Sequence, residues 1–154
     1  MAQDDLAAVG LACVFFQKKA FPTCFWFGEQ DVKVVYVITR SDVMGGASVH
    51  LLDLAKGVQD LGHEVTILVG GRGLVVDRAK QRGLDCRPLE YLIREISPWV
   101  DFKGYLELRR VLSELKPDIV HLHSAKAGIL GRLVAWRSAI PAVYTAHGWP
   151  FTEG

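Results

Sequence analysis

The sequence predicts an α/β fold of the Rossmann-like, doubly wound type, with a parallel sheet covered by helices on both faces. Two observations carry this prediction. Five short apolar runs have the length of strands, and stretches with helical spacing of apolar residues separate them. The runs are almost continuously apolar rather than alternating, which is typical of strands buried on both faces of a sheet. Right-handed crossovers then link the elements in the order βαβαβαβαβ.

The expected strands are the segments 33–39, 64–69, 85–90, 118–123 and 141–146. The first helix follows Gly46 and ends at Leu61-Gly62, because glycine readily takes the left-handed conformation of a helix cap. The second helix spans about 73–83 and ends at Gly83 in the same way. The apolar residues expected on the buried face of the first helix recur at helical spacing: Leu51, Leu54, Ala55, Val58 and Leu61.

The third helix spans about 101–116 and ends before Pro117. Its solvent side offers two ion pairs, Glu107–Arg110 and Arg110–Glu114. Its expected buried residues are Tyr105, Leu108, Val111, Leu112 and Leu115. The long connection before it, residues 91–99, is expected to form a surface loop or a lid.

The fourth helix begins at Ser124, a residue type preferred at the N-cap. Gly128 and Gly131 are expected to let this helix pack closely on the sheet. The large apolar residues expected to be buried on it are Ile129, Leu130, Leu133 and Val134.

Composition narrows the class of protein. The 154 residues are 50% hydrophobic and carry a net charge of +1, which predicts one globular domain and gives no basic footprint for a nucleic-acid partner. The three cysteines form neither a disulfide framework nor a metal-ligand spacing, which favours the cytoplasm.

Residues 1–31 differ from the remainder, 32–154, and are assigned to a separate apolar N-terminal extension. The apolar run 6–16 is shorter than the about 20 residues that span a bilayer. Asp4 and Asp5 stand where a secretory signal has basic residues. Two interpretations remain open: a poorly ordered extension, or a foot that contacts a membrane peripherally.

Three polar motifs are expected to meet in one crevice. In a sheet of strand order 3-2-1-4-5, the winding reverses between strands 1 and 4, and ligands bind at the carboxyl ends of the strands there. Gly45-Gly46 follows strand 1, His123-Ser124 ends strand 4, and His147-Gly148 ends strand 5. Segments far apart in the sequence should therefore line one pocket.

Gly45-Gly46 allows two interpretations. It lacks the pattern of a dinucleotide-binding fingerprint or of a P-loop. It is either a tight turn or a backbone cradle in which helix N–H groups approach a phosphate or a sugar. The glycine-rich stretch 70–73 follows strand 2, away from the reversal, and is interpreted as a turn.

The histidines have different expected roles. His121 and His123 lie on one face of strand 4, but no third ligand accompanies them, so no metal site is expected. His121 is interpreted as a core histidine with a satisfied partner. His123 stands where the crevice opens, and a neutral imidazole there can hydrogen-bond a sugar hydroxyl near pH 7. His147 either serves the site or shapes a loop.

Four segments together resemble the N-terminal domain of a family 4-type glycosyltransferase of GT-B architecture. They are 44–55, 61–65, 116–123 and 144–149, and the resemblance covers about 31–154. It implies two Rossmann-like domains facing a cleft, the N-terminal one holding mainly a glycan or lipid-linked acceptor and the C-terminal one mainly a nucleotide-sugar donor. It also implies transfer with retention of configuration, as in polysaccharide biosynthesis, and no cofactor beyond the nucleotide-sugar co-substrate.

The resemblance also implies roles for individual residues. Gly45 and Gly46 would approach the donor's diphosphate and sugar. His123, the candidate catalytic residue, would hydrogen-bond the transferred sugar near the reacting carbon. His147 would shape the acceptor side. Ser124 and Gly148, at the same two strand ends, are expected to join the substrate-binding set.

The sequence departs from the family where it ends. It stops at Gly154, before the N-terminal domain is normally complete, so the donor domain is expected in cis or in trans. Little turnover is expected from the chain alone. Two other classes stay open: a free-standing sugar- or nucleotide-binding module, and an inactive fragment of a split gene. Lys103, Arg109 and Arg110 on the third helix either meet anionic lipid at the inner face of the membrane or form a solvated helix face.

Overall fold

The computed structural model describes residues 31–42 and 44–146; the N-terminal extension expected at 1–31 therefore lies almost wholly outside the described residues. The strands are β1 (Lys33–Ile38), β2 (Glu64–Gly70), β3 (Asp85–Leu89), β4 (Ile119–His123) and β5 (Ala142–Thr145). The helices are α1 (Gly46–Asp60), α2 (Leu74–Gln81), α3 (Pro98–Leu115) and α4 (Ala125–Arg137).

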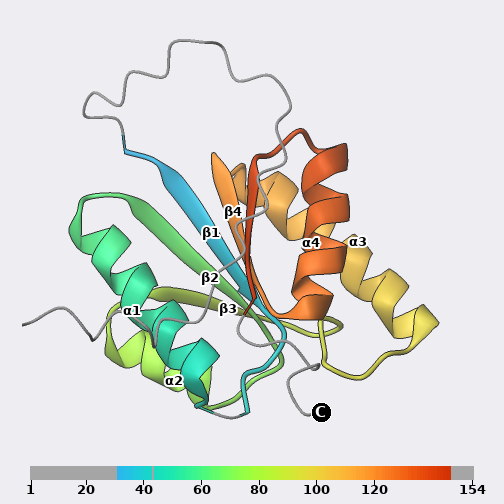
Figure 1. Ribbon diagram of the computed structural model, residues 1–154, viewed down its shortest axis with the longest axis horizontal. Helices are drawn as coiled ribbons and strands as arrows, with labels where there is room; N and C mark the ends of the chain where they lie inside the picture. Colours follow the sequence, from blue (N-terminus) through green and yellow to red (C-terminus); the bar gives the residue numbers. More distant parts are fainter. Residues whose placement is uncertain (1–30, 43, 147–154) are drawn as a thin grey trace, which may run out of the picture.

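All five strands are parallel and stand in the order β3-β2-β1-β4-β5. Helices α1 and α2 cover one face of the sheet, and α3 and α4 cover the other (Figure 1). The predicted doubly wound fold, its strands and its strand order are confirmed. The winding reverses between β1 and β4, as the sequence predicted.

The core has two halves because side chains of β1 alternate between the faces of the sheet. Val35 and Val37 belong to the cluster under α3 and α4, whereas Tyr36 and Ile38 belong to the cluster under α1 and α2. All four side chains are at most 3% exposed. The continuous apolar run of this strand is therefore explained by burial on both faces.

Helix α4 packs closely on the sheet through small residues. A Cβ on Gly128 would lie 2.6 Å from Cε2 of Tyr144, and one on Gly131 would collide with Leu122. The predicted close packing at both glycines is confirmed. The prediction that large residues of α4 are buried is partly wrong, because Ile129 is 63% and Leu133 is 42% exposed. Small residues and Val134 form the sheet-facing side, Leu130 packs against the core as predicted, and Ile129 and Leu133 point outward.

Three further expectations need correction. Leu61 is 77% exposed because α1 has ended before it. Helix α3 begins earlier than expected, with Pro98 in its first turn, where the missing proline N–H is not needed. Glu107 does not pair with Arg110; it accepts hydrogen bonds from the backbone N–H groups of Glu90 and Tyr91 at 2.8 and 2.9 Å.

The expected Arg110–Glu114 pair is present at 2.9 Å. Gly62 and Gly83 both have positive φ, as expected of glycines that follow a helix. Within residues 31–42 and 44–146, no helix combines the length and the apolar character that a membrane span requires.

Candidate functional site

The carboxyl ends of β1, β4 and β5 lie side by side. In the sheet register Ile38 pairs with His123, and His123 pairs with Thr145. The residues that follow β1 and β4 therefore leave the sheet at one edge, where the winding reverses. Of the predicted site residues, the structure brings Gly45, Gly46, His123 and Ser124 to this edge, and His147 and Gly148 lie outside the described residues.

Gly45 and Gly46 form the start of α1. Gly45 is the N-cap, and its carbonyl oxygen accepts hydrogen bonds from the N–H groups of Ser48 and Val49 at 3.0 and 3.1 Å. Its φ of −90° is open to any residue, and a Cβ on either glycine would meet no described atom within 4 Å. Among the described residues, neither backbone strain nor packing thus requires glycine here. The tight turn and the ligand cradle both stay predictions for these two glycines.

His123 is fully buried rather than facing an open crevice. Its ring lies among other rings on the α1 side of the sheet, with centroids 4.2 Å from His121, 6.0 Å from Tyr36 and 6.3 Å from His50. His121 lies within hydrogen-bonding distance of Thr145, with 2.7 Å between Nε2 and Oγ1, so it has the predicted partner, although its side chain is half-buried rather than in the core. Burial raises the pKa of Tyr36 to about 12, so its phenol stays neutral beside these rings.

Ser124 stands at the start of α4 in an unusual conformation. Its φ of 88° lies in a region that side-chain-bearing residues rarely adopt. The residue is the N-cap, as predicted, but its side chain does not cap the helix. Instead its Oγ hydrogen-bonds Oγ1 of Thr39 at 2.9 Å, which joins the ends of β1 and β4. A strained residue at the carboxyl edge of a doubly wound sheet, where such folds bind ligands, is a signal of function.

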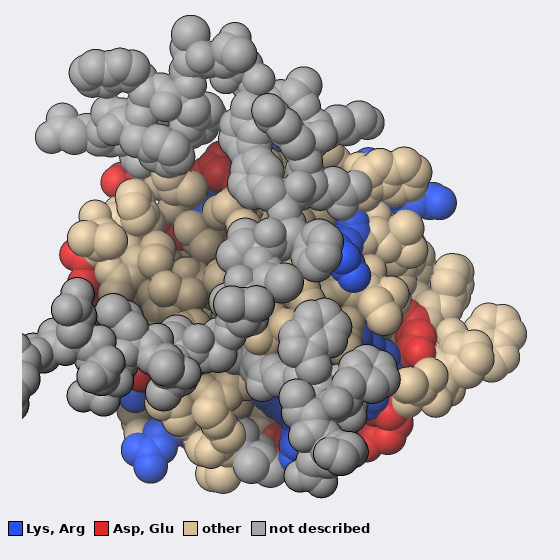
Figure 2. Space-filling model, viewed as in Figure 1, with Lys and Arg blue, Asp and Glu red and all other residues tan. Residues whose placement is uncertain are grey.

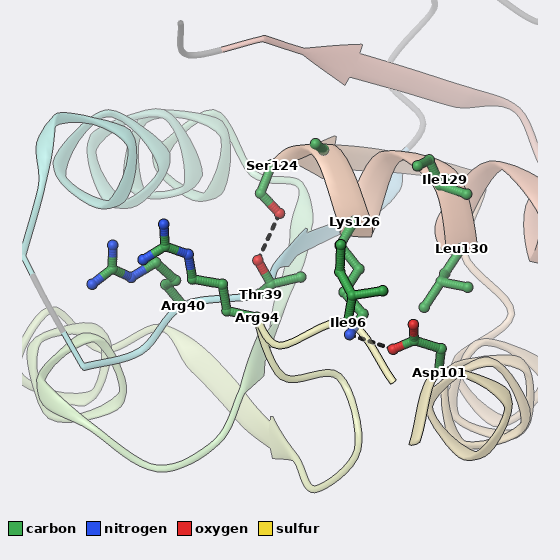
Figure 3. Close-up of a pocket in the computed structure, with 10 residues that line it drawn as sticks. Thr39, Arg40, Arg94, Ile96, Asp101, Ser124, Lys126, Ile129 and Leu130 are labelled. Atoms are coloured by element: carbon green, nitrogen blue, oxygen red, sulfur yellow. Dashed lines mark hydrogen bonds and ion pairs between the residues drawn. The ribbon is translucent and has the colours of Figure 1, made fainter. Parts of the chain in front are cut away.

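A pocket of about 460 Å³ opens beside this hydroxyl pair (Figure 3). It lies between the end of β1, the connection from β3 to α3, and the start of α4. Its lining residues are Thr39, Arg40, Arg94, Ile96, Asp101, Ser124, Ala125, Lys126, Ile129 and Leu130. Only Ser124 was predicted from the sequence.

The charged groups of the pocket fall into two sets. Arg40 binds the carboxylate of Asp42 through two nitrogens at 3.1 and 3.2 Å. Hydrogen bonding by Arg40, together with the nearby charge of Arg94, lowers the pKa of Asp42. Lys126 forms an ion pair with Asp101 and donates to the carbonyl oxygen of Glu95, so it fixes the connection before α3 to the start of α4.

The connection before α3 is anchored by specific contacts. Leu92 is fully buried, and Glu107 holds the backbone at Glu90 and Tyr91. A Cβ on Gly70 would collide with the carbonyl oxygens of Leu92 and Thr39, so this glycine lets the two loops meet. The glycine-rich stretch 70–73 is thus a structural turn, as predicted. The surface-loop interpretation holds for residues 91–97.

Sequence reasoning missed Arg40, Arg94 and Lys126. Arg40 follows strand 1 directly, and Arg94 lies in the long connection that was already noted as a surface loop. Their position next to predicted strand ends was the available signal, but no spacing motif links them. Among the described residues, no group of three or more histidines, cysteines or carboxylates could hold a metal ion.

Sequence comparison decides the family. Residues 44–153 match Glycosyltransferase Family 4. The chain belongs to this family. The predicted resemblance is confirmed at the level of the family, while retention of configuration and truncation stay predictions.

Curated relatives are glycosyltransferases of bacteria. The chain is 46% identical over 61 residues to the Escherichia coli UDP-Gal:alpha-D-GlcNAc-diphosphoundecaprenol alpha-1,3-galactosyltransferase, covering 39% of the chain and 16% of that protein. It is 40% identical over 53 residues to the putative glycosyltransferase EpsD of Bacillus subtilis (strain 168), covering 32% of the chain and 14% of EpsD. It is 23% identical over 116 residues to the O-antigen biosynthesis glycosyltransferase WbnH of Escherichia coli, covering 75% of the chain and 32% of WbnH. The chain thus spans less than a third of each relative.

Solved structures support the fold. MurG of Acinetobacter baumannii superposes with a TM-score of 0.58 at 23% identity, covering 71% of this chain and 33% of MurG. HepE from Anabaena, solved in complex with UDP and glucose, superposes with a TM-score of 0.58 at 17% identity, covering 72% of this chain and 28% of HepE. At these identities the likeness shows the fold alone.

Proposed function

We propose that this chain is the acceptor-side domain of a glycosyltransferase that moves a sugar from a nucleotide-sugar donor to a glycan or lipid-linked acceptor with retention. One observation carries the proposal: in a chain of this family, the uncrowded Gly45-Gly46 helix start, His123 and the pocket at Ser124 share one edge of the sheet. Ligands of doubly wound sheets bind at such an edge.

The proposed roles follow from the chemistry of each group. Gly45 and Gly46 let an anionic diphosphate approach the N–H groups and the positive dipole end of α1. That end stabilises the charge that develops on the departing diphosphate. His123 hydrogen-bonds the transferred sugar, which requires the site to open around this buried ring when substrate binds. His147 and Gly148 are assigned to the acceptor side.

A second domain that binds the donor belongs to the proposal, in cis or in trans. It is supported by the relatives, which are more than three times as long as the segments they share with this chain. Neither a metal nor a further cofactor is proposed for this domain, and no nucleic acid is proposed as a partner. The proposed location is the cytoplasm, with peripheral contact at the inner face of the membrane.

The test of transfer uses this chain joined to the coding sequence that follows it, or mixed with a separately encoded donor domain. Release of nucleoside diphosphate from a panel of nucleotide sugars is measured with and without extracted bacterial acceptors. We expect acceptor-dependent release that His123→Ala reduces at least about a hundredfold. His63→Ala, at the opposite, amino-terminal edge of the sheet next to the start of β2, should retain activity. Acceptor-dependent release that survives His123→Ala would refute the assigned role.

Peripheral membrane contact is proposed at the start of α3, and Lys103, Arg109 and Arg110 are assigned to the solvated helix face that was their other open interpretation. Arg110 is engaged by Glu114, whereas Ile96, Trp99 and Phe102 are 89%, 78% and 54% exposed. In Figure 2, uncharged side chains project at the right edge, where α3 begins in Figure 1. Trp99 and Phe102 are residue types that insert at a lipid interface.

Flotation with phosphatidylglycerol vesicles tests this surface. We expect the full chain to float, and Trp99→Ser with Phe102→Ser to abolish flotation. Leu133→Ser, an exposed apolar position on α4, is the matched control and should float normally. A protein that stays in the soluble fraction would exclude this contact.

A further inference from the structure

Three histidine side chains gather at the carboxyl edge between β1 and β4. The ring centroids of His121 and His123 are 4.2 Å apart, and the ring of His50 on α1 lies 6.3 Å from that of His123. The ring of Tyr36 on β1 lies 5.4 Å from His121 and 6.0 Å from His123. Imidazole is the side chain that changes its charge between about pH 5 and 8, so the charge at this edge depends on pH.

The histidine cluster, which is His50, His121 and His123, extends from the core to the solvent. His123 is fully buried, His121 is half-buried and His50 is exposed. Because the removal of a charged imidazole from water is unfavourable, a proton enters the cluster most easily at His50. A second positive charge is opposed by the first, since the rings are neighbours. The cluster therefore holds at most one proton near neutral pH and titrates as a coupled set.

The described groups around the histidine cluster come from each element packed against it. From β1, Tyr36 presents a neutral phenol, because burial raises its pKa to about 12. From β5, Thr145 presents a hydroxyl group, 2.7 Å from Nε2 of His121. The charged side chains on the segment after β1 and on α1 include two that are paired with partners of opposite charge: Asp42 with Arg40, and Asp53 with Arg82. A bound anion would add a negative charge that none of these groups supplies.

The exposed histidine of the cluster also stands near the open start of α1. Residues four apart share a face of a helix, so His50 lies on the same face as Gly46, one turn further along. A Cβ on Gly46 would meet no described atom within 4 Å. An anion at this edge would therefore reach an exposed imidazole whose neighbour, His123, is buried.

We infer that the histidine cluster takes up one proton when an anionic ligand binds at this edge. One N–H bond forms, at His50 or at a ring coupled to it, with a proton that the solvent supplies, and no bond of the ligand breaks. Proton uptake on binding means that the anion binds more tightly at lower pH, and that the anion in turn favours the protonated cluster. The inference rests on the proposed function and adds His50 and a dependence on pH to that site.

Isothermal calorimetry of the full chain with UDP-glucose tests the inference. The diphosphate of this ligand is esterified at both ends and keeps its full negative charge between about pH 6 and 8, so the ligand itself takes up no proton. Titrations at neutral pH in two phosphate-free buffers with different enthalpies of ionisation give the number of protons taken up. We expect about 0.5 to 1 proton per bound ligand, and an affinity that falls about fivefold to tenfold from pH 6 to pH 8. Uridine, which carries no phosphate, should bind without proton uptake.

Variants and ring signals locate the proton. His50→Gln should lower the uptake to less than about 0.3 proton and remove the pH dependence of the affinity, and its exposed position leaves the fold intact. His63→Gln removes an imidazole at the amino-terminal edge of the sheet and should leave the uptake unchanged. In the unmodified chain, the ligand should raise the pH at which the ring Cε1 protons of His50 and His123 titrate in nuclear magnetic resonance spectra.

Three results would overturn the inference. Binding with uptake of less than about 0.2 proton would mean that groups of fixed charge, such as Arg40 and Arg94, neutralise the ligand. Uptake that His50→Gln leaves unchanged would place the proton outside the cluster. Absence of binding at up to about 10 mM UDP-glucose would show that this edge holds no anion site of its own. In each case acceptor-dependent release by the joined enzyme would still uphold the proposed function.

Discussion

The glycines near the candidate site fall into two kinds: those that packing requires, and those that packing among the described residues does not require. Gly131 and Gly70 lack a Cβ because Leu122 and two carbonyl oxygens occupy the space. Gly45 and Gly46 have no such neighbours among the described atoms. Glycine thus serves packing at 70 and 131, and we propose that it serves a ligand at 45 and 46.

Gly46→Ala tests this distinction. A methyl group in the first turn of α1 meets open space, so we expect unchanged or higher stability, by up to about 1 kcal/mol, and a loss of transfer in the joined enzyme. Gly131→Ala is the matched control, which should lower stability by about 1–3 kcal/mol because its Cβ collides with Leu122. Urea unfolding measures both. Normal transfer by the stable Gly46→Ala variant would argue against the cradle.

Ser124 allows a second prediction about single residues. Ser124→Ala loses the hydrogen bond to Thr39 and keeps the unfavourable φ, whereas Ser124→Gly loses the same bond and relieves the φ of 88°. We expect the glycine variant to be more stable than the alanine variant by about 1 kcal/mol, although glycine in general costs stability. Urea unfolding of both proteins gives the difference. An alanine variant at least as stable as the glycine variant would show that the conformation is not strained.

Tyr36 predicts a response to alkaline pH. Burial raises the pKa of its phenol to about 12 in the folded chain, above the value of about 10 that tyrosine has in an unfolded chain. Between these two values the unfolded chain has released the proton and the folded chain has kept it, so stability falls as the pH rises from about 10 to 12. The Tyr36→Phe variant should lose about 2–3 kcal/mol less than the wild type across this interval. Parallel losses in both proteins would contradict the burial of an ionisable phenol.

At the scale of elements, side chains of α3 and α4 hold the connection between β3 and α3 in place. The carboxylate of Glu107 accepts two backbone hydrogen bonds from this connection, and Lys126 of α4 holds its far end. These contacts place Arg94 and Ile96 at the pocket. The position of the loop thus depends on side chains of the two helices behind it.

Glu107→Ala is expected to lower stability by about 1–3 kcal/mol, because two backbone donors lose a charged acceptor. Arg110→Ala, three residues along the same helix, removes only an exposed pair with Glu114 and should change stability by at most about 0.5 kcal/mol. Hydrogen exchange should speed up at Glu90 and Tyr91 in the first variant alone. Equal effects of the two substitutions would mean that the loop is not anchored through Glu107.

At the scale of the whole molecule, the spacing of apolar residues predicted the strands, the helices and the order of the strands, because backbone periodicity controls these features. The apolar runs predicted the strands, and the predicted parallel order correctly placed His123 and Ser124 next to the end of β1. The buried side of α4 was misjudged, because close packing selects small residues where hydrophobicity alone favours Ile129 and Leu133.

The sequence could not predict the pocket, because tertiary contacts rather than a sequence pattern bring its residues together. Arg40 and Arg94 are far apart in the sequence and share no spacing, and they come to one pocket through the contacts of Gly70, Leu92 and Glu107. Such tertiary contacts leave no periodic signal. The burial of His123 is of the same kind, since it depends on which rings pack beside the strand end.

The central claim is that ligands bind at the carboxyl edge between β1 and β4. Amide chemical-shift mapping of the isotope-labelled chain, 17.1 kDa in mass, tests it most directly, with inorganic pyrophosphate and then a nucleotide sugar as ligands. We expect pyrophosphate and the nucleotide sugar to shift the amides of 39–46 and 123–126 and to leave those at the opposite edge, near 33 and 64, unchanged. Shifts confined to that opposite edge, or none with either ligand, would contradict it.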